Sequence, residues 1–274
     1  MASKAARNGA APFVQSLARG LTVIGALDAP EPLSLSDIAR RSGLSRAAAR
    51  RFVLTLEQLG YVRARDGRFM LTPRVLELGS AYLSSLTLPE IALPHIRGLV
   101  EEVRESGVLS VLDEDSIVGV ARVPAGRVIT GTVVLGQRLP AWASASGRVL
   151  LAWLPAQRRE ECVARAELTP LTARTLRSRE ALTAELERVR SQGFALVDQE
   201  FELGLRSLAV PVSDRDGAVI AAVALVLQSA AGPLEDVLQR FVTPLRATCA
   251  EIERDLAAAG ARRGVVATLE SVGA

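Results

Sequence analysis

Residues 34–72, SLSDIARRSGLSRAAARRFVLTLEQLGYVRARDGRFMLT, contain two helical patterns, a glycine turn and a hairpin signal in direct succession. Ser34 can cap a first helix with a single apolar stripe, and Gly43 then stops that helix. Ser45 can cap a second helix that runs to about residue 59. Apolar residues in this second helix recur at spacings of three and four, so we expect one buried stripe. That stripe comprises Ala49, Phe52, Val53, Leu56 and Leu59.

The opposite side of the second predicted helix carries arginines. Arg46 and Arg50 lie one turn apart near its amino end, and no acidic residue occurs over residues 43–56. Such side chains can contact base edges and phosphates when a helix lies in the major groove. The alternative is that these arginines only solvate an exposed helix, but a solvated face usually mixes charges of both signs.

A basic hairpin follows at once. Val62 begins a strand, Asp66-Gly67 is a two-residue turn signal, and Phe69 and Leu71 return along the partner strand. A basic hairpin directly after a recognition helix is typical of a winged helix-turn-helix. The residues that we expect to contact double-stranded operator DNA are Arg19, Ser34, Ser45, Arg46, Ala47, Arg50, Arg51, Thr55, Arg63, Arg65 and Arg68.

The distribution of charge supports this assignment. Residues 1–73 hold eleven basic and five acidic residues, whereas the remaining 201 hold 22 basic and 25 acidic ones. Only the amino-terminal quarter is therefore suited to a polyanionic partner.

Length and composition indicate a soluble protein of two domains. The chain has 274 residues and is 49% hydrophobic. Its longest apolar run, residues 218–227, is too short to span a bilayer, and its amino end lacks a signal-peptide core, so we expect a cytoplasmic protein without a membrane partner. Cys162 and Cys249 lie far apart and outside any CxxC pattern, which favours neither a disulfide framework nor a zinc site.

Patterns that carry catalysis are missing from the sequence. His95, the only histidine, follows Pro94 at the start of a helical stretch, and the acidic run at 113–115 lies between two apolar runs, as a hairpin turn does. There is no GxSxG, GxxxxGK[ST] or GxGxxG motif. We expect no enzyme activity, no cofactor and no metal. An enzyme in which DNA is incidental, and an architectural DNA-binding protein, remain alternatives.

The rest of the chain predicts an α+β domain behind a helical linker. We expect tails at 1–11 and 259–274, the winged helix-turn-helix at 12–73, the linker at 74–106 and the α+β domain at 107–258. In the linker, helices are expected at 74–86 and 96–105, with breaks at Pro89 and Pro94. In the α+β domain, strands are expected near 108–113, 117–123, 128–134, 206–212 and 218–228. Its helices are expected near 145–154, 156–166, 178–192 and 233–258.

Five stretches then carry a resemblance to a known family. They are SLARGLTVI (16–24), LSDIARRSGLSRAAARRFVLTLEQLGYV (35–62), LTPRVLELGSAYLSSL (71–86), ASGRVLLA (145–152) and GFALVDQEFELGLRSLAVPV (193–212). In these stretches and in domain order, residues 13 to about 256 resemble the IclR family of bacterial transcription regulators, most closely its PcaR/PcaU/PobR branch. The resemblance implies a GAF/PAS-like α+β effector-binding domain. It also implies an effector that is an aromatic acid or a β-ketoadipate-pathway intermediate, with a short keto acid as the alternative.

The same resemblance implies an effector pocket over the sheet, at Val197, Ser207, Ala224 and Val226. The position often occupied by cysteine in the family is Ser207, and Ser213 stands where an aromatic residue or histidine is usual. Val197 stands where an acidic residue or serine is usual, and Ala224 and Val226 stand where family members that bind small keto acids have polar residues. A less polar pocket, bordered by Trp142, favours a larger and partly apolar acid.

A carboxylate of that acid needs donors. Residues 144–147 open a helix whose N–H groups and dipole could receive it, and Ser207 could add a hydroxyl contact. The alternative is that a serine only caps the helix and Gly147 only allows close packing. The residues that we expect near the carboxylate are Ser144, Ala145, Ser146, Gly147, Ser207, Arg122, Arg127 and Arg206.

The predicted function implies further partners. Helix-turn-helix proteins commonly bind paired half-sites about one helical turn apart, so we expect a dimer or a dimer of dimers. RNA polymerase is a further candidate partner. An effector that shifts the sensory domains could change the spacing of two recognition helices, and with it the affinity for DNA.

Overall fold

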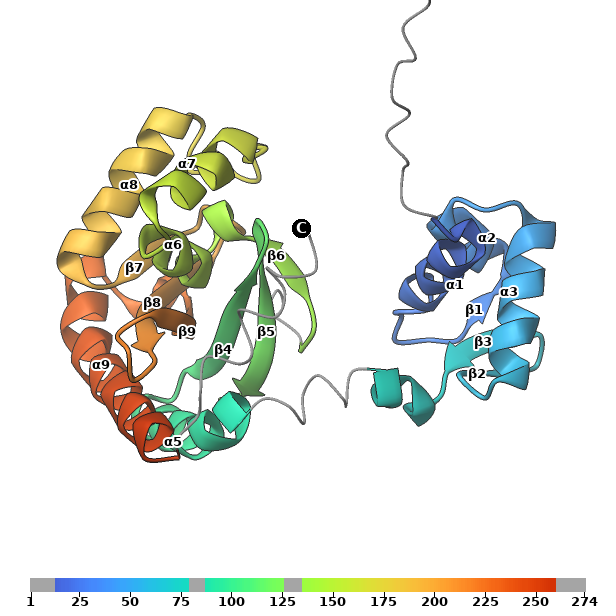
Figure 1. Ribbon diagram of the computed structural model, residues 1–274, viewed down its shortest axis with the longest axis horizontal. Helices are drawn as coiled ribbons and strands as arrows, with labels where there is room; N and C mark the ends of the chain where they lie inside the picture. The colour runs from blue at the N-terminus through green and yellow to red at the C-terminus, as the bar shows by residue number, and fades with distance from the viewer. Residues whose placement is uncertain (1–12, 79–86, 126–134, 260–274) are drawn as a thin grey trace, which may run out of the picture. The chain divides into compact units, whose positions relative to one another are not determined.

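The chain divides into two compact units, Met1–Tyr82 and Leu83–Ala274. The computed structural model describes residues 13–78, 87–125 and 135–259 (Figure 1). The boundary differs from the expected linker at 74–106, because the helix at 87–103 belongs to the core of the second unit. Within the described ranges, no helix combines the length and the apolar character that a membrane crossing requires.

The first unit combines three helices with a small antiparallel sheet of order β1-β3-β2. Its elements are α1 (Gln15–Ala26), β1 (Leu33–Ser34), α2 (Leu35–Ser42), α3 (Arg46–Gln58), β2 (Val62–Arg65), β3 (Arg68–Leu71) and the 3-10 turn η1 (Pro73–Val75). The Ser34 hydroxyl accepts a hydrogen bond from the Asp37 amide, 3.3 Å away, and so caps α2. Gly43 then ends α2 in the left-handed conformation, at φ 66°. Both boundaries confirm the sequence prediction.

The predicted stripe of α3 is buried except at its end. Ala49, Val53 and Leu56 are buried in the core of this unit, and Phe52 packs against it. Leu59 is 51% exposed, so its predicted burial was wrong. The reason is local: α3 stops at Gln58, and the chain then turns through Gly60, which has φ 82°.

The second unit is built on a six-stranded antiparallel sheet of order β6-β5-β4-β9-β8-β7. The strands are β4 (Ser106–Asp113), β5 (Ser116–Val123), β6 (Arg138–Pro140), β7 (Ala195–Asp198), β8 (Leu205–Ser213) and β9 (Val219–Gln228). The helices are α5 (Thr87–Val103), α6 (Ala145–Ala152), α7 (Ala156–Arg165), α8 (Arg179–Gln192) and α9 (Leu234–Ala258), with 3-10 turns η2 (Ala141–Ala143) and η3 (Ser229–Ala231).

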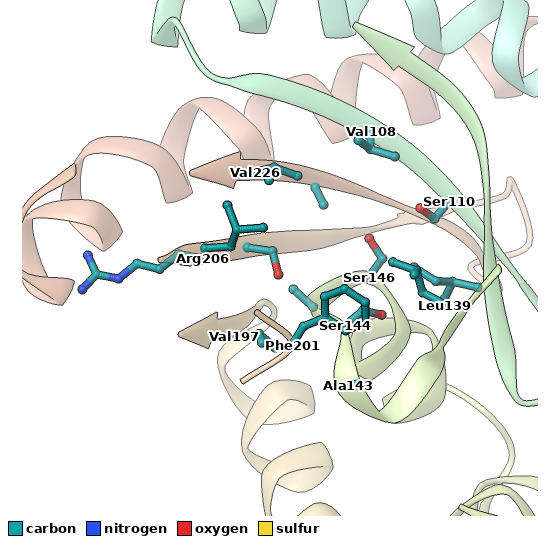
Figure 2. A pocket seen from close by; sticks show the side chains of 15 residues that line it. Val108, Ser110, Leu139, Ala143, Ser144, Ser146, Val197, Phe201, Arg206 and Val226 are labelled. Carbon is teal, nitrogen blue, oxygen red and sulfur yellow. The ribbon is translucent and has the colours of Figure 1, made fainter. Parts of the chain in front are cut away.

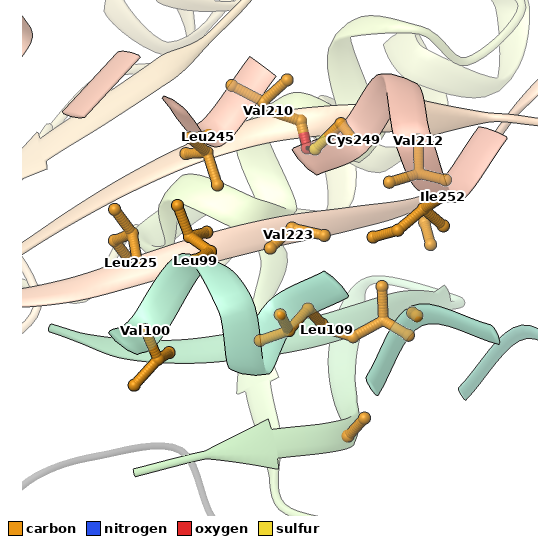
Figure 3. Close-up of a cluster of buried hydrophobic side chains, with 14 of the residues drawn as sticks. Leu99, Val100, Leu109, Val210, Val212, Val223, Leu225, Leu245, Cys249 and Ile252 are labelled. Atoms are coloured by element: carbon orange, nitrogen blue, oxygen red, sulfur yellow. Dashed lines mark hydrogen bonds between the residues drawn. The ribbon is translucent and has the colours of Figure 1, made fainter. Parts of the chain in front are cut away.

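Helices cover both faces of this sheet. On one face, α5 and α9 pack against alternate residues of the central strands (Figures 1 and 3). Figure 3 shows Leu99 of α5 and Leu245 of α9 in one cluster with Val223 and Leu225 of β9. On the other face, α6 and α8 form a second core with the intervening residues, such as Ala209 and Ala222. Successive strand residues therefore enter two different cores.

Several boundaries depart from the prediction. Helix α5 is continuous through Pro94, where a break was expected. Pro94 is exposed, so solvent can satisfy the carbonyl that it leaves unbonded, while Ala92, Ile96 and Leu99 keep the buried side packed. Strands β6 and β7 and helix α1 were not predicted. The expected strand at 128–134 and most of the expected helix at 74–86 lie outside the described residues.

Candidate nucleic-acid interface and effector cavity

One side of α3 presents the predicted basic residues to solvent. Arg46, Arg50 and Arg51 are exposed, and no described residue forms a hydrogen bond or ion pair with their guanidinium groups. Ala49, Val53 and Leu56 face the opposite way, into the core. The arginines are therefore available to an external anion, with Ala47 and Thr55 exposed beside them.

The helix caps use their own polar groups. The Ser45 hydroxyl accepts a hydrogen bond from the Ala48 amide at 3.3 Å, and the Ser34 hydroxyl donates to Asp37 Oδ2 at 2.7 Å. Hydrogen bonding to Ser34, and then to Arg40, lowers the pKa of Asp37, which keeps a negative charge at the start of α2. Ser34 thus has a structural role that is independent of any DNA contact.

The β2–β3 hairpin carries three exposed arginines. Arg63 and Arg65 lie on β2, and Arg65 approaches Asp66 in the turn, with 3.7 Å between Nε and Oδ2. Arg68 on β3 donates to the Pro32 carbonyl at 3.1 Å and so ties the hairpin to the chain before α2. Arg19 is exposed on α1. The hairpin is basic and solvent-facing, as a wing requires.

The second unit contains a cavity between the sheet and the amino end of α6, which we call the α6 cavity (Figure 2). Its empty space, including the mouth, is about 580 Å³. Most of its lining is apolar, and the hydroxyls come from serines on α6, β4 and β8. The lining residues are Val108, Ser110, Ile117, Leu139, Ala143, Ser144, Ala145, Ser146, Val197, Phe201, Leu205, Arg206, Ser207, Ala224 and Val226.

At the amino end of α6, some residues cap or pack the helix and others are available to a ligand. Ser144 caps the helix, because its hydroxyl accepts a hydrogen bond from the Gly147 amide at 3.1 Å. Gly147 is a packing residue: a Cβ atom there would lie 2.1 Å from the Ala141 carbonyl oxygen. Ala145 and Ser146 line the cavity, and no described residue accepts a hydrogen bond from their backbone N–H groups. These two N–H groups remain for an anion.

The predicted pocket residues on the strands meet in this cavity. Ser207 pairs with Val226, and Ala209 pairs with Ala224, so neighbouring strands present these positions on one face. Val197 of β7 also lines the cavity. Trp142 is buried in the core that α6 forms with the sheet and is not among the described lining residues.

The predicted arginine partners are placed differently. Arg206 borders the α6 cavity, but it lies next to Ser207 on β8 and opposite Leu227, so its side chain leaves the other face of the strand. Figure 2 shows this side chain extended away from the other labelled residues. Its guanidinium donates to Asp198 Oδ1 and to the Gly232 carbonyl. Arg122 lies opposite Val108, on the cavity face of the sheet. Arg127 is outside the described residues.

The environment of Asp198 shows how Arg206 is engaged. Partial burial raises the pKa of Asp198, but hydrogen bonds from Arg206 and Gln199 and the charges of Arg206 and Arg174 outweigh this effect, so that the pKa lies below its usual value. Asp198 is therefore ionised at neutral pH and neutralises Arg206. This pairing leaves Arg206 poorly suited to hold an effector carboxylate.

Sequence reasoning missed much of the cavity wall. Ser110 and Val108 of β4, Ile117 of β5 and Phe201 of the β7–β8 loop line it without having been predicted. The one available signal was Ser110, a polar residue within the apolar run of residues 108–112. Periodicity alone could not assign it to a face, because helices cover both faces of this sheet.

Two family models match the chain. The model described as Bacterial transcriptional regulator IclR C-terminal matches residues 80–254, and the model described as IclR helix-turn-helix domain matches residues 16–66. The chain belongs to the IclR family. The predicted fold class, a helix-turn-helix unit followed by an α+β unit, and the predicted class of DNA-binding transcription regulator are both confirmed.

Two members of the IclR family that are similar to this chain are named as regulators. The Pca regulon regulatory protein of Pseudomonas putida is 38% identical over 88% of this chain and 83% of its own length. The p-hydroxybenzoate hydroxylase transcriptional activator of Acinetobacter baylyi is 35% identical over 88% of this chain and 91% of its own. Both relatives are transcriptional regulators, not enzymes.

A solved structure extends the comparison to a bound ligand. The crystal structure of an IclR homolog from Microbacterium hydrocarbonoxydans, complexed with 4-hydroxybenzoate, is 30% identical to this chain and has a TM-score of 0.74. The match covers 88% of this chain and 98% of that one. The similarity therefore spans both units of this IclR-family chain.

Proposed function

We propose that this protein is an operator-binding transcription regulator, not an enzyme, whose DNA affinity is set by an aromatic carboxylic acid in the α6 cavity. The observation that carries the proposal is the combination of a largely apolar cavity with two N–H groups at the start of α6 that bond to no described residue. The apolar lining suits an aromatic ring, and the helix amino end suits a carboxylate. The names of the relatives and the ligand of the solved homolog support the same class of acid.

The apolar strand residues favour an aromatic acid over a short keto acid. Val197, Ala224 and Val226 supply methyl groups where a small, fully polar ligand would need hydrogen bonds. A glyoxylate-sized molecule would leave these groups in contact with water or with an empty space. A benzene ring would cover them and would gain the free energy of apolar burial.

On the DNA side, α3 enters the major groove and the hairpin contacts the backbone. Arg46, Arg50 and Arg51 face outward together, while Arg63 and Arg65 extend the positive surface. A palindromic operator would be bound by a dimer or a dimer of dimers in the cytoplasm, with RNA polymerase as a further partner. Bound acid changes the separation of two such α3 helices, and thereby the affinity.

A ligand panel with the full-length protein tests this function. Benzoate, 4-hydroxybenzoate, protocatechuate, β-ketoadipate, glyoxylate and pyruvate are compared by thermal unfolding. An acid present at about 100 times its dissociation constant should add near 2.7 kcal/mol of stability. We expect the aromatic acids to raise the unfolding midpoint and to shift DNA binding in a gel-shift assay. Stabilisation by the keto acids alone would contradict the aromatic assignment, and indifference to every acid would indicate an architectural protein.

A further inference from the structure

A buried hydroxyl of β4 faces the α6 cavity without a hydrogen-bond partner. Ser110 is fully buried, its Oγ atom lines the cavity side of the sheet, and no described residue bonds to it. Burying a hydroxyl in this state costs stability, because the hydrogen bonds that water provided are not replaced. A residue that costs stability in the ligand-free chain is expected where a ligand supplies the missing bond.

A second serine on the same strand shows that this arrangement is not a general feature of β4. Ser106 is also fully buried and lies four residues before Ser110, on the same face of the strand. Its hydroxyl accepts a hydrogen bond from the Ala125 amide at 3.1 Å. The Ser106 hydroxyl therefore stabilises the chain itself, whereas the Ser110 hydroxyl makes no such bond within the described part of the chain.

Ser146 faces Ser110 from the opposite wall. Ser146 is 4% exposed, belongs to the first turn of α6, and forms no side-chain hydrogen bond with a described residue. Figure 2 shows the hydroxyls of Ser110 and Ser146 directed into the same part of the cavity, one from the sheet and one from the helix. The unbonded N–H groups of Ala145 and Ser146 lie at this end as well. Hydroxyl and amide donors thus converge from two elements.

The other cavity hydroxyl lies at a distance along the sheet. Ser207 pairs with Val226, while Ser110 pairs with Ala222, so the two positions are offset by four residues along β9. That is about 13 Å along the strand. Ala224 and Val226 form the apolar floor between them. A ring lying on this floor would have one polar end at Ser110 and Ser146 and would point its other end toward Ser207.

We propose that the Ser110 hydroxyl donates a hydrogen bond to the effector carboxylate, which is clamped between β4 and the amino end of α6. This assignment rests on the proposed function and names the sheet-side contact of the same ligand. The carboxylate accepts a hydrogen bond from the Ser110 hydroxyl on the sheet side. On the helix side it accepts hydrogen bonds from the Ser146 hydroxyl and from the N–H groups at the start of α6. Arg206 is not required as a partner of the carboxylate, which agrees with its pairing to Asp198. The acid itself supplies the hydrogen bond that no described residue gives the Ser110 hydroxyl.

Ser110→Ala separates this role from a structural one. The variant should bind 4-hydroxybenzoate roughly 10- to 100-fold more weakly, because a hydrogen bond to a charged group is lost. Its ligand-free unfolding midpoint should stay the same or rise, because the substitution breaks no hydrogen bond to a described residue. Ser106→Ala is the matched control: its midpoint should fall while its affinity stays within about twofold of wild type. Ser110→Cys, which keeps the shape of the side chain but is a weak donor, should lose affinity in the same direction as Ser110→Ala.

A neutral probe identifies the ligand group involved. With 4-hydroxybenzamide, which lacks the carboxylate charge, Ser110→Ala should lose much less affinity than it loses with 4-hydroxybenzoate. Equal losses for acid and amide would overturn the assignment to the carboxylate. Binding of 4-hydroxybenzoate to Ser110→Ala and Ser110→Cys as tightly as to wild type would overturn it while leaving the proposed function intact. A wild-type protein that binds no aromatic acid would overturn both.

Discussion

Arg148 and Glu200 form a bidentate ion pair in the interior of the second unit. Arg148 Nη1 and Nη2 lie 2.8 and 2.6 Å from the two carboxylate oxygens of Glu200, and the Arg148 side chain is 1% exposed. Arg148 Nε also donates to the Trp142 carbonyl at 2.9 Å. The pair joins α6, whose first turn lines the α6 cavity, to the loop that carries Phe201 into it. One buried charge pair thus connects two walls of the cavity.

Replacing Glu200 with glutamine should destabilise the protein by about 3–5 kcal/mol, because the buried Arg148 charge loses its partner. We expect the lower end of that range, since Glu185 lies 3.8 Å from Arg148 Nη1 and compensates in part. Glu161→Gln, which breaks the exposed pair with Arg158, should change stability by less than about 1 kcal/mol. Urea unfolding at pH 7 measures both. A Glu200→Gln variant as stable as Glu161→Gln would show that the buried pair contributes little.

Strand alternation gives opposite expectations for two neighbours on β8. Ser207→Ala should weaken the binding of an aromatic acid by about 0.5–1.5 kcal/mol, because its hydroxyl faces the α6 cavity. Arg206→Gln should leave that affinity nearly unchanged but lower stability, since Arg206 pairs with Asp198 and with the Gly232 carbonyl. Calorimetric titration and thermal unfolding of both variants test this. A large loss of affinity in Arg206→Gln would return Arg206 to the ligand site.

The DNA-binding unit was predictable because its signals are local. The Ser34 cap, the Gly43 stop and the apolar stripe at Ala49, Val53 and Leu56 all lie within a few turns of each other, and the structure has each of them. Because this stripe is buried, the arginines on the opposite side of α3 are exposed. Where a local rule failed, at Pro94, tertiary packing of α5 outweighed the loss of one backbone hydrogen bond.

The α6 cavity was only partly predictable because distant segments assemble it. Ser110, Ser146 and Ser207 come from β4, α6 and β8, and helices cover both faces of the sheet at β4 and β8. Nearly continuous apolar runs result, which hide the alternation that would assign a residue to one face. The family resemblance supplied Val197 and Ser207. It could not supply Ser110, whose significance depends on the three-dimensional structure, where its hydroxyl bonds to no residue of the described ranges.

Two glycines should respond oppositely to alanine. Gly147→Ala should destabilise the protein by about 1–3 kcal/mol or more, because the new Cβ atom would lie 2.1 Å from the Ala141 carbonyl oxygen and would force α6 away from η2. Gly98→Ala in α5 meets nothing within 4 Å and should stabilise by roughly 0.5–1 kcal/mol. Thermal unfolding tests this prediction: the midpoint of Gly147→Ala should fall below that of the wild type, and the midpoint of Gly98→Ala should rise above it. Similar midpoints for both would contradict the close packing of α6 on Ala141.

Arg50→Ala should weaken binding to a DNA fragment that the wild-type protein selects from a random pool by about 1–3 kcal/mol, if Arg50 contacts a base edge. Arg50 is exposed on α3, one turn after Arg46, and no described residue engages it. Arg158→Ala removes the same charge from α7 in the other unit and should leave affinity unchanged. Fluorescence anisotropy across a salt series distinguishes the kinds of contact: a lost base contact leaves the salt slope unchanged, whereas a lost phosphate contact reduces it by about one. An Arg50→Ala protein that binds like Arg158→Ala at every salt concentration would remove Arg50 from the interface.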